Sequence, residues 1–267
     1  SRSLSDLVRG KTIHSAELRR ARLAPDTTPT EFAERLGGAK INSVGRRGKH
    51  ILVDLDNART LIVHLRMSGR FSLLAAEREN PKFTHAVFHF SEYERLVFDD
   101  QRHFGLMKIV DTSGLHAAKE LAKLAPEPFS DEFSLRYFRS ALAGSSRSLK
   151  EFLLDQTKVC GLGNIYASEA MFSAGIDPRV PANSISARRA SRLFESVRGV
   201  LAEAIEHNAS RPVDPENLEG SYFSGGNTDG WLVYDREDED CVRCGSAIIR
   251  VKQGGRSTYY CRRCQRS

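Results

Sequence analysis

The chain has 267 residues, of which 40% are hydrophobic and 28% charged, and its formal net charge is +6. This apolar content supports real hydrophobic cores and excludes an intrinsically disordered protein, while the length suits two domains. No run approaches the roughly 18 apolar residues of a membrane span, and the first residues show no apolar segment of the secretory kind.

The amino-terminal half is expected to be rich in β-strands after two short helices. Residues 4–8 carry apolar side chains at helical spacing, and a second helix is predicted between Thr28-Pro29 and the glycines at 37–38. Strand-like runs follow at residues 51–55, 60–65, 70–74, 84–90, 95–98 and 106–110. Several short strands at such close spacing predict a β-sandwich or barrel over residues 1–125.

The pattern becomes helical after Pro126-Glu127-Pro128. Apolar side chains recur at helical spacing within residues 130–143, 149–154, 164–174 and 186–207. These segments predict a helical domain over residues 126–235. The segment 207–230, which contains glycines and an Asn-Thr-Asp run, is expected to form a mobile loop within it.

Positive charge is concentrated at the carboxyl end. Residues 241–267 contain seven Lys and Arg side chains and no Asp or Glu, so this segment carries +7 and the remainder −1. An acidic stretch at residues 235–240 precedes it, and the change of sign predicts a boundary and a third unit over residues 236–267. A unit of purely positive charge suits a polyanion, because each neutralised phosphate releases counterions.

Four of the five cysteines form two Cys-x-x-Cys pairs with sixteen residues between them: Cys241, Cys244, Cys261 and Cys264. This spacing predicts one structural zinc ion, because four thiolates leave no open coordination position. A β-hairpin fits between the pairs, with strands at 247–251 and 257–260 and a turn at 253–256. Two disulfides of a secreted protein are disfavoured by the odd Cys160, and a redox pair by the lack of a βαβ pattern.

Three further motifs allow both a functional and a purely structural interpretation. The turn Gly161-Leu162-Gly163-Asn164 could bring backbone amides to an anion, with Asn164 as helix cap or phosphate donor, or could simply connect two helices. Lys49, in a basic turn before a strand, could sit in a cleft, although its spacing alone favours an ordinary turn. Met67-Ser68-Gly69 and Arg102-His103-Phe104-Gly105 could enter a base stack or pack into a core.

Together these motifs resemble, in order along the chain, the formamidopyrimidine-DNA glycosylase and endonuclease VIII family. Residues 150–178 resemble its helix-two-turn-helix, residues 252–265 its zinc finger, and residues 64–69 and 100–105 its two void-filling loops. The resemblance runs from the first helix to the last cysteine. It implies an α+β fold, with a β-sandwich amino-terminal domain, a helical helix-two-turn-helix domain and a carboxyl-terminal β-hairpin zinc finger.

The resemblance also implies the roles of the charged residues. Cys241, Cys244, Cys261 and Cys264 would bind the zinc. Lys49 would contact a phosphate beside the lesion and assist β-elimination. Arg256 would grip phosphates around the lesion and help the second elimination. Lys150 and Asn164 would hold the backbone of the damaged strand.

The gap left by an everted nucleotide would be filled by Met67, Arg102 and Phe104, with Arg102 pairing with the orphan base. Such a plug is needed because extruding a base costs a few kcal/mol of stacking and pairing. This set of side chains resembles the formamidopyrimidine branch, which removes oxidised purines such as 8-oxoguanine and formamidopyrimidine. The resemblance therefore implies a base-excision repair glycosylase with AP lyase activity, a monomer of the bacterial cytoplasm and nucleoid that acts on duplex DNA with oxidised bases or abasic sites.

Two other functions are compatible with parts of this pattern. A non-catalytic protein of the same fold that binds damaged DNA would use the same loops and finger. A zinc-ribbon protein that binds RNA would explain the finger but not the loops with Met67, Arg102 and Phe104.

The sequence departs from the family pattern at its beginning. The family's nucleophile is an amino-terminal proline followed by a glutamate, whereas this chain begins Ser1-Arg2. Alignment on Lys49 places about seven family residues before Ser1, and the uncapped first helix agrees with that placement. We expect the chain from Ser1 to bind DNA and to cleave it poorly or not at all. Smaller departures are Asp235, where glycine is common, and Phe83, where histidine is common.

Overall fold

The structure, a computed structural model, describes residues 1–209, 214–216 and 230–267. Most of the segment 207–230, for which a mobile loop was expected, lies outside the described residues. Contacts divide the described chain into two compact units, one built mainly on residues 1–122 and the other on residues 123–209 and 230–267. None of the helices in the described part of the chain combines the length and the apolar character that crossing a bilayer requires.

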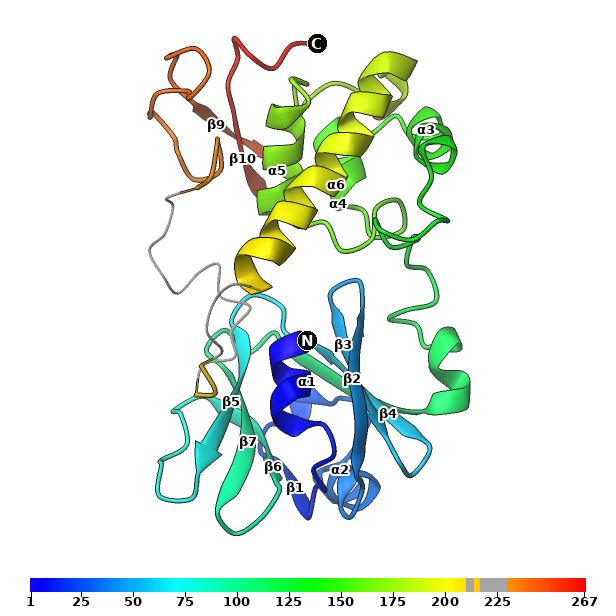
Figure 1. The fold of residues 1–267 in the computed structure, drawn as a ribbon, viewed down its shortest axis with the longest axis vertical. Helices are drawn as coiled ribbons and strands as arrows, with labels where there is room; N and C mark the ends of the chain where they lie inside the picture. The colour runs from blue at the N-terminus through cyan, green and yellow to red at the C-terminus, as the bar shows by residue number, and fades with distance from the viewer. Residues whose placement is uncertain (210–213, 217–229) are drawn as a thin grey trace. The chain divides into compact units, whose positions relative to one another are not determined.

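The first unit contains two four-stranded antiparallel sheets (Figure 1). One sheet has the order β2 (Ile41–Arg47), β3 (His50–Leu55), β4 (Arg59–His64) and β8 (Leu106–Asp111). The other has the order β1 (Ser15–Leu18), β6 (Thr84–His89), β7 (Glu94–Asp100) and β5 (Gly69–Ala75). Buried side chains from both sheets, such as Leu61 and Val63 of β4 and Phe88 and Phe98 of β6 and β7, form one core. This arrangement is the expected β-sandwich.

Two helices complete this core. Helix α1 (Arg2–Val8) buries Leu4 and Val8, and α2 (Pro29–Leu36) buries Phe32 and Leu36. Helix α2 begins where its sequence predicts, because the Thr28 side chain accepts a hydrogen bond from the Glu31 amide while the Glu31 carboxylate accepts one from the Thr28 amide. The prediction missed β1 and β2. Strand β2 has only two buried positions, Ile41 and Val44, so its sequence lacks the alternation of a half-buried strand.

The second unit contains four α-helices and a β-hairpin. They are α3 (Leu135–Ala143), α4 (Leu149–Leu154), α5 (Asn164–Ser173), α6 (Ala187–Ala209), β9 (Ile249–Gln253) and β10 (Arg256–Tyr260). Helix α5 lies between α6 and the hairpin and contacts both (Figure 1). Its first residue therefore reaches the hairpin, while its last turn lies over the zinc finger.

Several predicted boundaries in this unit were wrong, including that of the strand expected at 247–251, which is β9 at Ile249–Gln253. The helix predicted from residue 130 begins at Leu135, because Ser134 is its N-cap and accepts from the Tyr137 amide at 3.2 Å. Phe133, which fitted the helical pattern, stacks on Phe194 from the preceding turn. The hairpin turn is only Gly254-Gly255, since both residues have positive φ, and the strands pair right up to it.

Candidate nucleic-acid interface

The four paired cysteines meet at one point of the second unit. Their sulfur atoms all lie within 4.8 Å of one another, with Cys241 and Cys264 3.8 Å apart and Cys244 and Cys261 3.5 Å apart. Zinc–sulfur bonds of about 2.3 Å in a tetrahedron place sulfur pairs about 3.8 Å apart, so the cluster fits one structural zinc ion. None of the five cysteines, all of which the structure describes, forms a disulfide, which argues against the disulfide alternative, and Cys160 is buried in the unit as a packed side chain.

The zinc finger presents Arg256 at the tip of its hairpin. Arg256 is exposed and follows directly on the Gly254-Gly255 turn. The next residue, Ser257, is held by side chains of α4 and α5. Its carbonyl oxygen accepts hydrogen bonds from the Lys150 ammonium and from the Asn164 amide at 3.1 Å. The hairpin tip is therefore fixed to the starts of α4 and α5.

Lys150 is fully buried, although it was predicted as a residue that holds the DNA backbone. Its ammonium also donates to the Thr258 hydroxyl at 2.6 Å. Burial, together with the nearby positive charge of Arg256, lowers the pKa of Lys150 to about 8. The side chain thus supports the hairpin that carries Arg256, which the sequence pattern did not indicate.

The sequence left open whether Asn164 caps its helix, and in the structure it does not. Gly163 is the N-cap of α5, and Asn164 is the first helical residue. While its amide nitrogen donates to the Ser257 carbonyl, its side-chain oxygen is buried and has no hydrogen-bond partner among the described residues. In the preceding turn, the Gly161 amide donates to the Gln156 side chain at 2.9 Å. That amide serves the connection between the helices rather than an anion.

Lys49 lies at the tip of the β2–β3 hairpin in the first unit. The turn consists of Gly48, with a φ of +57°, and Lys49, which is exposed. The next residue, His50, pairs with His64 of β4, and the centroids of the two rings lie 4.7 Å apart in an edge-to-face arrangement. Burial, assisted by the nearby Arg66, lowers the pKa of His64 to about 3, so this histidine is neutral at pH 7.

The two predicted void-filling loops present large side chains to solvent. Met67 is 57% exposed and Phe104 is 50% exposed, which contradicts the alternative that they pack into a core. The Arg102 guanidinium lies over the Phe104 ring, 5.5 Å from its centroid. Exposed apolar side chains of this size are the wedges that can enter a base stack.

A buried carboxylate that the sequence analysis missed joins these two loops. Asp100, at the end of β7, accepts hydrogen bonds from the Ser68 hydroxyl, from the Arg102 amide at 3.2 Å and from the Gly105 amide at 2.7 Å. Although burial raises the pKa of Asp100, these hydrogen bonds together hold it below its ordinary value. A Cβ atom on Gly105 would lie 2.7 Å from the Phe98 ring, so the loop needs glycine there.

A second missed carboxylate anchors the segment that enters the zinc finger. Glu169 of α5 is buried and accepts from the backbone amides of Leu232, Val233 and Tyr234. Burial raises its pKa despite these hydrogen bonds. Asp235, which follows Tyr234, has a φ of +61°, and this explains why glycine is common at this position in the family that the chain resembles. Phe83, the other departure, packs edge to face on His103.

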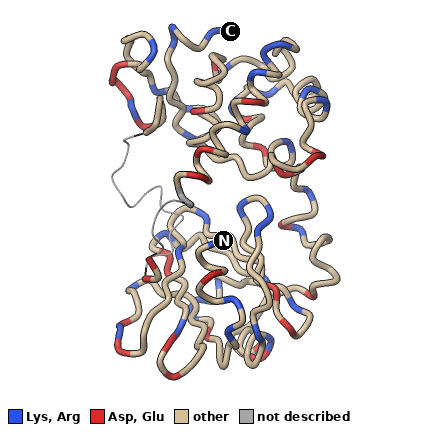
Figure 2. The backbone as a smooth tube through the Cα atoms, in the orientation of Figure 1, with Lys and Arg blue, Asp and Glu red and all other residues tan. Residues whose placement is uncertain are grey.

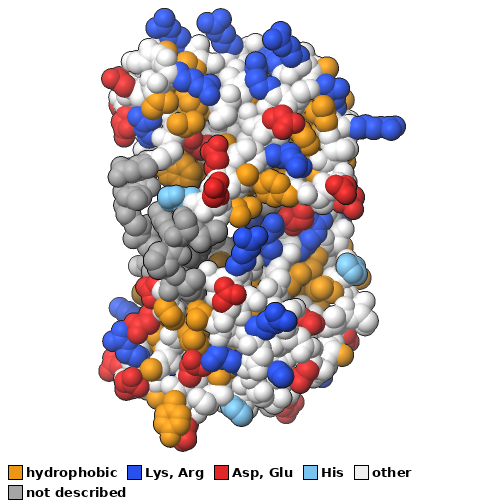
Figure 3. Space-filling view, in the orientation of Figure 1, with side chains coloured by type: hydrophobic (Ala, Val, Ile, Leu, Met, Phe, Trp, Pro, Cys, Tyr) orange, Lys and Arg blue, Asp and Glu red, His pale blue; other side chains and the backbone are white. Residues whose placement is uncertain are grey.

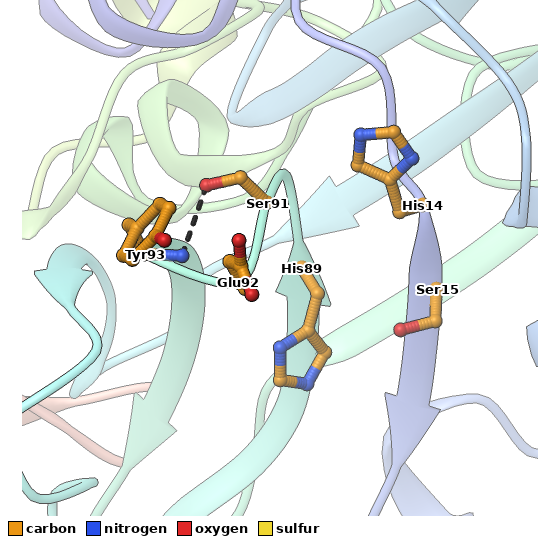
Figure 4. A pocket seen from close by; sticks show the side chains of 6 residues that line it. All are labelled: His14, Ser15, His89, Ser91, Glu92 and Tyr93. Atoms are coloured by element: carbon orange, nitrogen blue, oxygen red, sulfur yellow. Dashed lines mark hydrogen bonds between the residues drawn. The ribbon is translucent and has the colours of Figure 1, made fainter.

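A hollow elsewhere in the first unit contains none of the predicted site residues. It has a volume of about 490 Å³ and is lined by His14, Ser15, His89, Ser91, Glu92 and Tyr93 (Figure 4). His89 is engaged by Glu17 at 2.7 Å, and the Ser91 hydroxyl accepts from the Tyr93 amide. The predicted site residues of this unit therefore lie on exposed loops and a hairpin tip, outside this hollow.

Three family models match successive parts of the chain. They are the formamidopyrimidine-DNA glycosylase N-terminal domain at residues 1–107, the formamidopyrimidine-DNA glycosylase H2TH domain at 124–213, and a zinc finger found in FPG and IleRS at 238–266. Formamidopyrimidine-DNA glycosylases of Listeria innocua and Bacillus subtilis are 39% and 38% identical over 99% of this chain, and this chain covers 96% and 95% of theirs.

Solved structures agree with these matches. The Lactococcus lactis Fpg in complex with DNA containing an abasic site superimposes with a TM-score of 0.91 at 31% identity, over all of this chain and 96% of that one. A mutant of the same protein with DNA containing Fapy-dG gives a TM-score of 0.90, also at 31% identity and with the same coverage. The family models, the full-length relatives and the fold together show that this chain belongs to the formamidopyrimidine-DNA glycosylase family.

Proposed function

We propose that this protein is a base-excision repair DNA glycosylase with AP lyase activity, acting on duplex DNA that contains oxidised purines or abasic sites. The observation that carries the proposal is the pair of loops tied together by Asp100, which hold Met67, Arg102 and Phe104 in solvent. A chain gains nothing in stability from exposing such side chains, whereas a protein that everts a base needs them to fill the space.

In the proposed complex, Met67 and Phe104 enter the gap left by the everted nucleotide, and Arg102 donates hydrogen bonds to the orphan base. The Arg102 guanidinium is already oriented by the Phe104 ring. Filling the gap offsets the few kcal/mol that unstacking and unpairing cost. Because Asp100 fixes both loops to the end of β7, the plug is ordered before DNA binds and loses little conformational freedom on insertion.

Phosphates are gripped by Lys49 in the first unit and by Arg256 in the second, and both side chains lie at exposed hairpin tips. Lys49 also assists β-elimination, and Arg256 the second elimination. Lys150 and Asn164 support binding of the damaged strand through the hairpin tip that they hold. The zinc ion, held by the four cysteines, supplies the cross-link that a finger too short for its own core requires.

No residue of the described chain is assigned to the attack on C1′. The proposed roles concern how this chain binds the backbone, replaces the everted nucleotide and stabilises the phosphates during elimination. Two observations support the roles in elimination. The Lys49 side chain is exposed at a rigid two-residue turn, and the Arg256 side chain follows directly on the glycine turn.

The test uses protein expressed from its complete gene and a duplex with a single 8-oxoguanine. Base release and strand cleavage are measured, together with the affinity for a duplex containing a tetrahydrofuran abasic analogue. Phe104→Ala should lower base release at least about tenfold, since a factor of ten corresponds to about 1.4 kcal/mol and stacking on an aromatic ring contributes roughly 1–3 kcal/mol per base. Tyr93→Ala, which removes another exposed aromatic ring of the same unit, is the matched control and should leave release unchanged.

Two outcomes would contradict the proposal. Tight binding of the abasic analogue without release of 8-oxoguanine would favour a non-catalytic protein that recognises damaged DNA. Tighter binding of structured RNA than of the abasic duplex would favour an RNA-binding zinc ribbon.

We also propose domain limits of 1–125, 126–235 and 236–267, and a monomer that works on the nucleoid in the bacterial cytoplasm. The family matches at 1–107, 124–213 and 238–266 support these limits. Limited proteolysis at the two boundaries and sedimentation of the intact protein would test them.

A further inference from the structure

The second unit contains a basic hollow that the proposed function does not use. It has a volume of about 380 Å³ and lies where the end of α5 meets α6 and the zinc finger. Four arginines line it: Arg189, Arg192, Arg243 and Arg266. No Asp or Glu side chain is among its lining residues. Blue segments gather around the carboxyl terminus at this end of the unit (Figure 2).

This hollow is separate from the candidate interface. Asn164, at the first residue of α5, contacts the hairpin tip beside Arg256, whereas the hollow includes Ser173 at the last residue of the same helix. Ten residues of α-helix at about 1.5 Å each place these two ends roughly 15 Å apart. At roughly 3.4 Å of helix axis per base pair, about four base pairs span this distance, so the hollow would take a stretch of backbone other than the one held at Arg256.

Three of the four guanidinium groups donate to backbone carbonyls of the protein, and for Arg266 the acceptor is the carbonyl of Arg263 at 3.4 Å. Arg243 stacks over the Phe172 ring, 4.3 Å from its centroid, and donates to the Phe172 carbonyl at 2.9 Å. Arg189 donates to the backbone carbonyl of Arg266. Burial, and then the adjacent Arg192, lower the pKa of Arg189, while the carboxylate of Asp177 raises it.

The zinc site does not account for this charge. A zinc ion with four thiolates carries a formal charge of −2, which is smaller in magnitude than the combined +4 of the four arginines. The nearby carboxylate of Asp177 is buried and engaged by Arg179 at 2.6 Å and 2.9 Å. An anion from outside the chain would therefore find uncompensated positive charge and oriented donors in the hollow.

We infer that this hollow is a second phosphate-binding site, which takes the backbone of a second segment of nucleic acid while the candidate interface holds the first. Arginine forks match the geometry of phosphate oxygens and form charge-assisted hydrogen bonds with them. A polyphosphate backbone suits the site better than an isolated phosphate, because residues that line the hollow have further exposed arginines close to them in sequence, Arg188 before Arg189 and Arg262 and Arg263 before Cys264. Figure 3 shows Lys and Arg side chains gathered on this end of the unit. The inference rests on the proposed function only in assuming that the candidate interface holds the first segment of nucleic acid.

The test measures two affinities on the same protein. The candidate interface is first saturated with a short abasic-analogue duplex, and a labelled undamaged duplex is then titrated, with anisotropy as the readout. The second duplex should bind more weakly than the first and with a clear dependence on salt. The variant Arg192→Gln/Arg266→Gln should weaken second-duplex binding at least about tenfold and reduce its salt slope by roughly 1 to 2, while first-duplex affinity changes less than about twofold.

Lys123→Gln/Arg136→Gln is the matched control, because it removes the same charge from exposed positions of the same unit outside the hollow. It should change neither affinity by more than about twofold if location, and not net charge, decides binding. Absence of a second binding event, or an equal loss in the control, would overturn the inference. Binding of inorganic phosphate in the hollow without binding of a second duplex would also overturn the inference. Failure to bind the first duplex would instead contradict the proposed function, so the two failures are distinguishable.

Discussion

Lys150 and Asn164, which stand on different helices, donate hydrogen bonds to the same acceptor, the backbone carbonyl of Ser257. That carbonyl directly follows Arg256, the exposed arginine at the tip of the zinc-finger hairpin. The hairpin is therefore positioned from two sides by side chains of the helical unit, and not by the zinc alone. A buried lysine is a costly way to hold a loop, which indicates that the placement of Arg256 matters.

Replacing Lys150 by methionine should loosen the hairpin while keeping a buried apolar stem of similar length. The Thr258 hydroxyl loses its 2.6 Å donor, and the Ser257 carbonyl keeps only Asn164. Affinity for the abasic-analogue duplex should fall by about 5- to 100-fold, corresponding to roughly 1–3 kcal/mol for broken buried hydrogen bonds. Fluorescence anisotropy would measure it, with the exposed Lys123→Met as control. An affinity equal to that of the control would refute the positioning role.

The pKa of Lys150 predicts how stability depends on pH. Because its folded-state pKa is about 8 and its ordinary value is 10.5, the unfolded chain binds more protons between these values. The contribution of Lys150 to the free energy of unfolding should therefore increase as pH rises from about 8 to 10.5. Urea unfolding of the protein and of Lys150→Met at several pH values gives this contribution as a difference. A difference that is constant or that shrinks over this range would contradict the assigned pKa.

Asp100→Asn should separate recognition of damage from general DNA binding. Asparagine offers one acceptor oxygen in place of two, so the hydrogen bonds from Ser68, Arg102 and Gly105 cannot all be kept. Affinity for the abasic-analogue duplex should fall about tenfold or more, whereas affinity for undamaged duplex should change less than about twofold. Asp111→Asn, an exposed carboxylate at the end of β8, is the control. Equal losses on both duplexes would show that Asp100 does not act through the plug.

Removal of the metal should unfold the finger and leave both cores intact. The finger cluster contains few buried side chains besides its cysteines, whereas the two main cores are extensive. Structural zinc contributes roughly 10–16 kcal/mol to the folding of such small units. Metal analysis should find one zinc per chain, and strong chelation should abolish binding of the abasic-analogue duplex while most of the far-ultraviolet circular dichroism persists. Full DNA binding by metal-free protein would contradict the role given to the finger.

The elements that could be predicted from the sequence are those with a strong local pattern. Helix α4 ends where its apolar residues end, the capping box fixes the start of α2, and the four cysteines define the zinc site by spacing alone. Strands β1 and β2 were missed for different reasons: β1 has only four residues and pairs with the distant β6, whereas β2 buries only Ile41 and Val44.

The residues of the candidate site also differ in whether the sequence predicted them. The motifs alone left open whether Met67 and Phe104 pack into a core, the resemblance to the family implied that they and Arg102 fill a gap in DNA, and all three are exposed. Asp100 and the buried position of Lys150 were not predicted, because each acts through contacts with residues remote in sequence, such as Ser68 and Thr258. A charged residue inside a motif gives no local signal of whether it faces solvent or another strand.

The most direct test of the account is borohydride trapping of protein from the complete gene on a duplex with a single 8-oxoguanine. The account predicts a covalent protein–DNA adduct, because AP lyase chemistry proceeds through an imine that borohydride reduces. It also predicts that Phe104→Ala reduces adduct formation at least about tenfold, while Tyr93→Ala does not. Wild-type protein that binds this duplex but forms no adduct and releases no base would contradict the account.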